Sequence, residues 1–428
     1  MNKKISLGAA ISFMVVVVAI TFCITMIFSL NRFNSKIVNI KEKDDINNKI
    51  TQLDRIVAQS YAGEVDHDKL INAIARGYVS GIGDPYAMYY TAKELNLHNQ
   101  TIKGIIMGIG INSQRDDSGY ILVTKVYNNS PAASSGMHVG DLIISIDGQD
   151  IKAIDYSAAV EMLKGEAGTS VKLTYRRDTQ DISAELFRKK IDIPSIEYST
   201  IGTTAYMKIS TFSDKTPAEF QSAYGQAIKD GMITMIIDIR GNSSSEYLQA
   251  AKVLDRILPV GNLGFEKSRE GTVKPLAVSD ADEISMPISV IVNSTTAGAG
   301  ELFAACLQEA GKVKIVGTTT MGKGVIQQIF PLSDGSAVEL TTSYVLTPQR
   351  KEINLVGIKP DFEVKLTAAQ EKTAYLLDQN TDPQIKKALE VLTIVLPVTP
   401  PEQTPSPESS APEPPPEQTS DTNAQPAT

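Results

Sequence analysis

The chain has 428 residues, which is long enough for two or three domains. Its formal net charge of −8 is mild, and Arg and Lys are scattered, so no nucleic-acid-binding surface is expected. Two cysteines cannot form a disulfide framework. The three histidines, His67, His98 and His138, are dispersed without the spacing of metal ligands, so we expect neither a metal site nor a cofactor.

An uncharged apolar run extends from Ile5 to Leu30. A run of this length can cross a bilayer of about 30 Å as one helix, so it predicts a transmembrane anchor over 5–30, with 1–4 as a cytoplasmic tip. A cleaved signal peptide is the alternative, but the run exceeds the usual apolar region and no Ala-x-Ala site follows it. Positive charge lies on both sides of the run and does not settle its orientation.

Residues 31–100 are predicted to form a stalk and an N-terminal helical segment. The polar stretch from Asn34 to about Ser60 favours a stalk helix, and a second helical stretch runs from Lys69 to Ser80. It is followed by Gly-Asp-Pro-Tyr at 83–86, which by itself is only a turn signal.

Short strands and one helix are predicted from about Thr101 to Arg177. The strands are Ile105 to Asn112, Tyr120 to Val126, Leu142 to Ile146 and Val171 to Tyr175, and the helix is Tyr156 to Leu163. Within this region Met107-Gly108-Ile109-Gly110 is followed by Asn-Ser-Pro-Ala-Ala at 129–133 and by Gly-Met-His-Val-Gly-Asp-Leu-Ile at 136–143.

These ordered segments resemble a PDZ domain, which we place over 101–190. In such domains the Gly-rich loop holds a terminal carboxylate through backbone N–H groups, and the peptide adds to a sheet edge as a strand. The resemblance implies that Met107, Gly108, Ile109 and Gly110 bind the carboxyl termini of peptides or proteins. A module kept only for packing is the alternative.

From about Asp192 to Val364 buried-type strands alternate with helices, which is an α/β pattern. One strand, Thr234 to Ile239, runs into Arg-Gly-Asn-Ser-Ser-Ser at 240–245 and then a helix from about Glu246 to Leu258. Another, Pro287 to Val292, runs into a small-residue turn and a helix stopped by Gly311, followed by a strand from Val313 to Val316. A turn of this kind aims helix N–H groups at whatever lies at the strand end.

The turn from Asn293 to Glu301 and the Gly-Lys-Gly-Val-Ile-Gln segment at 322–327 resemble the carboxy-terminal processing peptidases, or tail-specific proteases. The resemblance spans roughly Gly77 to Val364 and implies an α/β core of ClpP/crotonase-like fold over 191–370 with an inserted PDZ domain. In that family the turn reads approximately Asn-x-x-Ser-Ala-Ser-Ala-x-Glu, and the middle serine attacks. An ungapped alignment places that serine at Gly298. It also implies Lys323 as the general base, Gln327 as the lysine-orienting residue and the Ala299 amide as an oxyanion donor.

Two departures from the family pattern indicate impaired catalysis. Glycine has no atom with which to attack, and the family's Arg-Gly-Asn-Pro-Gly-Gly loop is here Arg-Gly-Asn-Ser-Ser-Ser, with Gly241 and Ser244 at oxyanion-loop positions. The serines alternatively form only a loop and a cap for the next helix.

Two interpretations follow from these departures. In one, the chain is a pseudoprotease that binds protein carboxyl termini. In the other, it is an active endopeptidase that uses Ser294, Thr295 or Thr296, or an active enzyme into which glycine was introduced.

The rest of the chain is predicted from composition and resemblance. A helical segment is expected over 371–396, and the Pro-, Glu- and Ser-rich tail over 397–428 cannot bury a core and should be disordered. Resemblance to membrane-tethered bacterial processing peptidases implies a single-pass protein of the cell membrane with both domains outside the cytoplasm. A homo-oligomer is left open.

Overall fold

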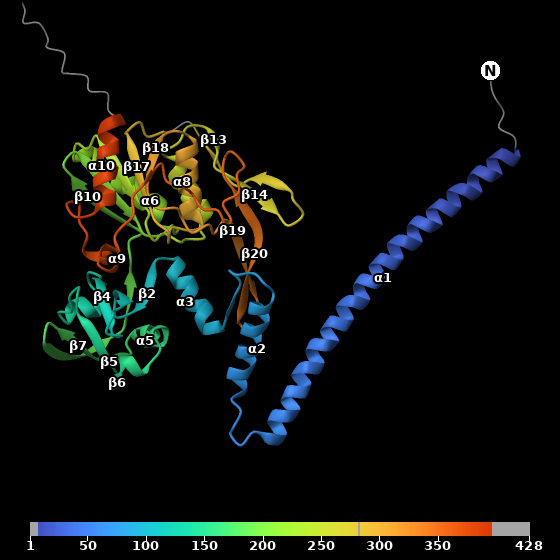
Figure 1. The fold of residues 1–428 in the computed structure, drawn as a ribbon, viewed down its shortest axis with the longest axis horizontal. Helices are drawn as coiled ribbons and strands as arrows, with labels where there is room; N and C mark the ends of the chain where they lie inside the picture. The colour runs from blue at the N-terminus through green and yellow to red at the C-terminus, as the bar shows by residue number, and fades with distance from the viewer. Residues whose placement is uncertain (1–6, 281–282, 396–428) are drawn as a thin grey trace, which may run out of the picture. The chain divides into compact units, whose positions relative to one another are not determined.

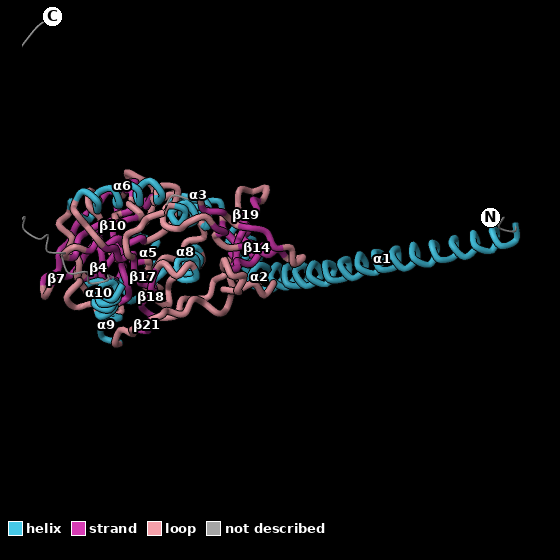
Figure 2. The backbone as a smooth tube through the Cα atoms, turned by 90° about the horizontal axis from the view of Figure 1, so that it is seen from above, coloured by secondary structure: helices cyan, strands magenta, loops and turns pink. Residues whose placement is uncertain are grey.

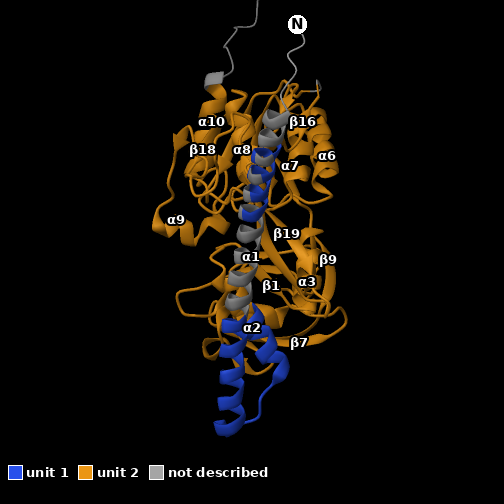
Figure 3. Ribbon diagram, turned by 90° about the vertical axis from the view of Figure 1, so that its right-hand side faces the viewer, with its two compact units in different colours: residues 1–75 blue, residues 76–428 orange. Residues whose placement is uncertain are grey.

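The computed structural model describes residues 7–280 and 283–395. The chain divides into two compact units, an N-terminal unit over 1–75 and a C-terminal unit over 76–428 (Figure 3). The predicted cytoplasmic tip at 1–4 and the predicted disordered tail at 397–428 lie outside the described residues.

The N-terminal unit consists of helices. α1 runs from Leu7 to Ser60 and includes the expected stalk helix, and α2, from His67 to Gly81, begins in this unit and continues into the next. Among the helices of the described residues, none has both the length and the apolar character needed to cross a membrane. The anchor over 5–30 therefore stays a prediction from the sequence.

The first part of the C-terminal unit is built on an antiparallel sheet of order β3-β4-β5-β7-β8, with β6 paired to β5. The strands are β3 (Ile111–Arg115), β4 (Ile121–Val126), β5 (Leu142–Ile146), β6 (Gln149–Asp150), β7 (Ser170–Arg177) and β8 (Gln180–Phe187). The helices are α4 (Pro131–Ser134), α5 (Tyr156–Leu163) and the short 3₁₀ helix η1 (Ile151–Ala153). The expected β5 and α5 have the predicted bounds.

Local sequence explains how these elements begin and end. Asp155 caps α5, because its carboxylate accepts hydrogen bonds from the amides of Ser157 and Ala158. The expected strand from Ile105 to Asn112 is divided instead into β2 (Ile105–Gly108), which pairs with β9 (Lys189–Asp192), and β3. It breaks because Gly110 has φ +82°, which extended strands do not adopt.

A six-stranded sheet of order β10-β11-β12-β17-β18-β21 forms the centre of the second part, and it confirms the expected α/β pattern. The strands are β10 (Ile196–Ile201), β11 (Thr204–Ile209), β12 (Thr234–Asp238), β17 (Ile288–Val292), β18 (Val313–Gly317) and β21 (Phe362–Glu363). Only β10 pairs antiparallel. Asp238 pairs with Ile291, so the carboxyl ends of β12 and β17 are adjacent and the loops that follow them meet.

Helices cover both faces of this sheet, which explains why β12 and β17 are buried at every position. α6 (Thr216–Lys229), α7 (Tyr247–Asp255) and α8 (Ala299–Glu309) pack on one face, and α10 (Pro383–Val395) packs on the other. Figure 2 shows α6 and α10 at opposite edges of this part of the chain. The assignment of this core to the ClpP/crotonase-like folds stays a prediction.

A buried ion cluster joins β12 to the start of α10. Arg240 donates to Asp238 Oδ2 and Asp382 Oδ2, each at 2.6 Å, and the two carboxylates are 0% and 2% exposed. Asp382 also accepts the amide of Gln384 and so begins α10. Removal of the arginine would leave two buried carboxylates unpaired.

A second sheet of order β1-β20-β14-β15, with β19 paired to β20, carries the segment around the predicted lysine (Figure 1). Its strands are β1 (Met88–Tyr90), β14 (Phe265–Ser268), β15 (Val273–Pro275), β19 (Val325–Pro331) and β20 (Ala337–Leu346). The remaining elements are α3 (Ala92–Ile102), α9 (Ala368–Lys372), the 3₁₀ helix η2 (Ala374–Leu376) and the pair β13 (Gly261–Asn262) and β16 (Val278–Ser279).

Candidate active site and peptide-binding groove

Gly298 lies in the sharp turn between β17 and α8. Its backbone has φ 59° and ψ −119°, a conformation that residues with a side chain rarely adopt. Sharp strand-to-helix turns of this type present the nucleophile in several hydrolases. Gly298 is thus a buried residue in a strand-to-helix turn.

The carbonyl of Ser244 occupies the space beside this turn. A Cβ placed on Gly298 would lie 2.5 Å from Ser244 O and 3.6 Å from the hydroxyl of Tyr247. The amide of Ala299, the predicted oxyanion donor, donates to the same carbonyl at 2.8 Å. In this conformation the Ser244 carbonyl occupies the space that a side chain at position 298 would need, and it also accepts the amide predicted to bind the oxyanion.

The other predicted oxyanion positions are also engaged within the chain. The Gly241 amide donates to Asn293 Oδ1 at 3.0 Å, and the Ser244 amide donates to Asn242 Oδ1 at 3.3 Å. The Ser244 hydroxyl donates to Phe212 O at 2.9 Å, which fixes the serine side chain against the core. These bonds hold the loop in its present position.

Glu301 connects the turn with the lysine segment, and the sequence reasoning did not assign it a role. Its carboxylate accepts the amide of Gly298 at 3.0 Å, the amides of Gly322 and Lys323 at 2.6 and 2.7 Å, and the Thr320 hydroxyl at 2.5 Å. Burial raises the pKa of Glu301, although these hydrogen bonds act in the opposite direction. Glu301 matches the glutamate that ends the turn motif of the resembling family, and this match could have indicated its importance.

Lys323 and Gln327 meet at Tyr86. The Lys323 ammonium lies 5.4 Å from the centroid of the Tyr86 ring, and the Gln327 side-chain amide donates to Tyr86 O at 2.7 Å. Gln327 therefore contacts the tyrosine backbone in this conformation. Burial, with Glu301 and Asp84 nearby, raises the pKa of Tyr86.

The Gly-Asp-Pro-Tyr segment, which the sequence indicated as a turn and which resembles the family segment before the peptide-binding domain, thus lies beside Lys323 and Gln327. Asp84 holds it against β20 by accepting the Thr341 amide at 2.9 Å, and it also accepts the Tyr86 amide at 3.0 Å. Burial raises the pKa of Asp84, but these hydrogen bonds outweigh burial and hold that pKa below its usual value.

The neighbouring hydroxyl groups differ in access. Thr296 is fully buried, and its hydroxyl donates to Ile239 O at 3.0 Å. Thr295 is exposed and donates to Asn293 Oδ1 at 3.0 Å, while Ser294 is exposed on the same turn. The Thr296 hydroxyl therefore connects this turn to the end of β12 and is not available to solvent in this conformation.

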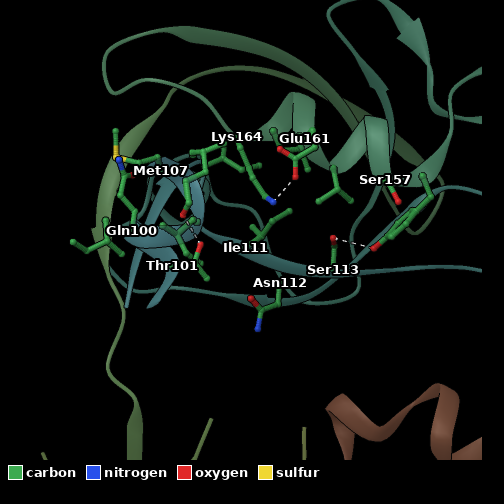
Figure 4. Close-up of a pocket in the computed structure, with 18 residues that line it drawn as sticks. Gln100, Thr101, Met107, Ile111, Asn112, Ser113, Ser157, Glu161 and Lys164 are labelled. Carbon is green, nitrogen blue, oxygen red and sulfur yellow. Dashed lines mark hydrogen bonds and ion pairs between the residues drawn. The ribbon is translucent and has the colours of Figure 1, made fainter. Parts of the chain in front are cut away.

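A cavity of about 460 Å³ lies between β3 and α5, with α3 as a third wall. Figure 4 shows its labelled side chains, among them Gln100 and Thr101 from α3, Ile111 and Ser113 from β3, and Lys164 at the end of α5. All four predicted peptide-binding residues, Met107 to Gly110, line this cavity, which we call the PDZ groove.

Close packing explains the glycines of the loop that lines the PDZ groove. A Cβ on Gly108 would lie 2.9 Å from Leu163 O, and one on Gly110 would lie 2.3 Å from the Ser130 Cβ. The loop is also tied to the domain, because the amide of Ala132 donates to Ile109 O at 2.9 Å. Larger residues at these two positions would displace the loop from the groove.

Comparison with known proteins agrees with this architecture. Residues 203–364 match the family profile "Peptidase family S41", and residues 96–176 match "PDZ domain". A "Probable CtpA-like serine protease" of Staphylococcus aureus (strain MSSA476) is 30% identical over 358 residues, which cover 83% of this chain and 72% of the relative. A protein of the same description from Staphylococcus saprophyticus is 30% identical over 337 residues, covering 78% and 68%.

Solved structures are similar to the chain as well. An S41 protease homologue from Bacteroides fragilis has a TM-score of 0.54 at 17% identity, covering 79% of this chain and 93% of that one, and it supports the fold. A photosystem II D1 C-terminal processing protease has a TM-score of 0.49 at 24% identity, covering 74% and 86%. The chain belongs to peptidase family S41, in its PDZ-containing, CtpA-like branch of carboxy-terminal processing peptidases.

Proposed function

We propose that this chain is a non-cleaving member of its family that binds the carboxyl termini of peptides or proteins in the PDZ groove. The observation that carries the proposal is steric. Position 298 is a glycine, and the Ser244 carbonyl lies where the side chain of a nucleophile at this position would project. The same carbonyl accepts the Ala299 amide, which the family resemblance assigns to the oxyanion.

The expected loss of rate is large. Removal of the nucleophile from a well-studied serine protease lowers kcat by about 10⁶-fold, which is roughly 8 kcal/mol of barrier. An oxyanion donor that is already paired costs about 10² to 10³ in rate. At most a trace of hydrolysis by water is therefore expected.

A protease assay tests the catalytic part of the proposal. The full-length protein, purified in detergent, is incubated with casein and separately with a serine-directed covalent probe. We expect no turnover above a heat-inactivated sample and no labelling. Robust turnover that disappears in Lys323→Ala would overturn the proposal and would indicate that Ser294, Thr295 or Thr296 attacks.

A binding assay tests the PDZ part. A fluorescent peptide with a free apolar carboxyl terminus is compared with its carboxy-amidated twin. Short peptides of this kind bind PDZ-type grooves with micromolar affinity, about −8 kcal/mol. We expect the amidated twin to bind at least about tenfold more weakly, because it lacks the charge that the loop amides hold. Equal affinities would exclude this mode of binding.

We also propose that the protein is held at the cell membrane by residues 5–30, with both domains outside the cytoplasm. The support is the absence of any charged residue from Ile5 to Leu30. In cell fractionation the full chain should sediment with membranes, and a version lacking residues 1–33 should not. Protease added to intact spheroplasts should digest the full chain, and recovery of an intact protein would contradict the proposed orientation.

A further inference from the structure

A second cavity, of about 480 Å³, lies beside the substituted catalytic centre. Its wall includes the Ser-rich loop at 243–245, Gln327 of β19 and residues of α3. We call it the hydroxyl-lined cavity, because Ser210, Thr211, Ser243 and Ser245 are among its lining residues. Its size falls within the usual range for ligand sites.

Two carboxylates line this cavity, and neither forms an ion pair within the described residues. Glu246 lies directly after the serines, is half-buried, and its carboxylate has no hydrogen-bond partner in the described part of the chain. Glu339 is only 8% exposed, and its Oε2 accepts the Tyr90 hydroxyl at 2.7 Å. Carboxylates that are withdrawn from water without a cation are unfavourable, so this pair favours a positively charged occupant.

The other lining groups fit the same occupant. No lysine or arginine lines the cavity, so nothing positive among the lining residues except a protonated His98 competes for the carboxylates. Ile102 and Ile329 provide apolar surface for an aliphatic stem, and the hydroxyls provide acceptors for N–H groups. A long side chain that is apolar along its stem and cationic at its end matches this combination.

We propose that the hydroxyl-lined cavity receives a lysine or arginine side chain of the polypeptide bound by this protein, with Glu246 and Glu339 as its counter-charges. The inference rests on the proposed role as a peptide-binding protein. Thr101 of α3 lines both this cavity and the PDZ groove, so one helix separates the two sites. A helix is about 10 Å across, and an extended chain covers about 3.3 Å per residue, so roughly three residues span that distance.

The test uses paired peptides with free carboxyl termini, identical except for lysine or norleucine at one position. The lysine is moved one residue at a time from the second to the eighth position before the terminus. Fluorescence anisotropy with the full-length protein should show about tenfold tighter binding for lysine at one or two adjacent positions. The preference should shrink as salt is raised, because a half-exposed ion pair is screened.

Matched variants locate the effect. Glu246→Gln should reduce the lysine preference to below about threefold, and Glu371→Gln, which removes an exposed carboxylate on α9 outside the cavity, should leave it unchanged. Because Glu246 has no partner within the described residues, its substitution should not unfold the protein, and a thermal melt checks this. A second variant carries both Glu246→Gln and Glu339→Gln and should lose the lysine preference completely.

Two outcomes overturn the inference. One is equal binding of lysine and norleucine peptides at every position. The other is a lysine preference that survives in a folded Glu246→Gln variant and in the variant that also carries Glu339→Gln. Carboxy-amidated peptides distinguish failure of this inference from failure of the proposed function. If lysine is preferred but amidation has no effect, only the proposal of carboxylate binding in the PDZ groove is refuted.

Discussion

A serine at the predicted nucleophile position, Gly298→Ser, should destabilise the protein without creating an active enzyme. Position 298 has φ 59°, which costs a residue with a side chain about 1–3 kcal/mol. The added Cβ would also lie 2.5 Å from Ser244 O, a backbone atom that cannot rotate away. If the loop moves, the hydrogen bond from the Ala299 amide is lost, at about 0.5–1.5 kcal/mol.

These contributions add to a loss of about 2–4 kcal/mol in the free energy of unfolding. For a domain of this size each kcal/mol lowers Tm by about 2–4 °C, so a fall of roughly 9 °C is expected by scanning calorimetry. Gly298→Ala should show the same fall, because it adds the same Cβ. Gly202→Ala is the matched control, since Gly202 has φ 57° but no atom within 4 Å of the added Cβ, and it should lose only the cost of its backbone conformation.

Activity should return only when the loop changes as well. We expect Gly298→Ser alone to cleave casein at least about 10²-fold more slowly than a variant that also carries Ser243→Pro, Ser244→Gly and Ser245→Gly, because the single variant lacks a free oxyanion donor. Full activity from the single change, with an unchanged Tm, would refute the steric and oxyanion reasoning together.

Two further predictions concern the PDZ groove and the core. Gly110→Ala should abolish binding of free carboxyl termini and lower Tm, because the new Cβ would lie 2.3 Å from the Ser130 Cβ. The control is Gly148→Ala, which has a similar φ of 80° but open space around it and should keep binding. A Gly110→Ala variant that still binds would contradict this reasoning. Arg240→Met should cost about 3–5 kcal/mol in thermal unfolding, because it leaves two buried carboxylates unpaired. Arg176→Met, which removes an ion pair at the surface, should lower Tm far less, and equal falls in Tm would contradict the role of the buried cluster.

Much of the architecture was predictable from the sequence because it depends on local patterns. The strand Leu142–Ile146 and the helix Tyr156–Leu163 have the predicted bounds, since apolar periodicity and the Asp155 cap lie within the same few residues. The mostly apolar strands at 234–238 and 288–292, which are buried at every position, likewise indicated a sheet covered on both faces. The family was recognisable because its motifs are short and contiguous. The break of the expected strand at 105–112 was missed, because a glycine in an apolar run does not by itself indicate the positive φ that Gly110 adopts.

Only the tertiary structure decided what surrounds the substituted position. Ser244 and Gly298 are separated by more than fifty residues, and their contact depends on adjacent carboxyl ends of β12 and β17. Gln327 contacts the backbone of Tyr86, 241 residues earlier, and Glu301 accepts bonds from 322 and 323. A sequence motif specifies residue types at fixed offsets, but hydrogen bonds between distant segments depend on how strands pair and helices pack. For this reason the glycine at the predicted nucleophile position can be recognised in the sequence, whereas the Ser244 carbonyl beside it is found only in the folded chain.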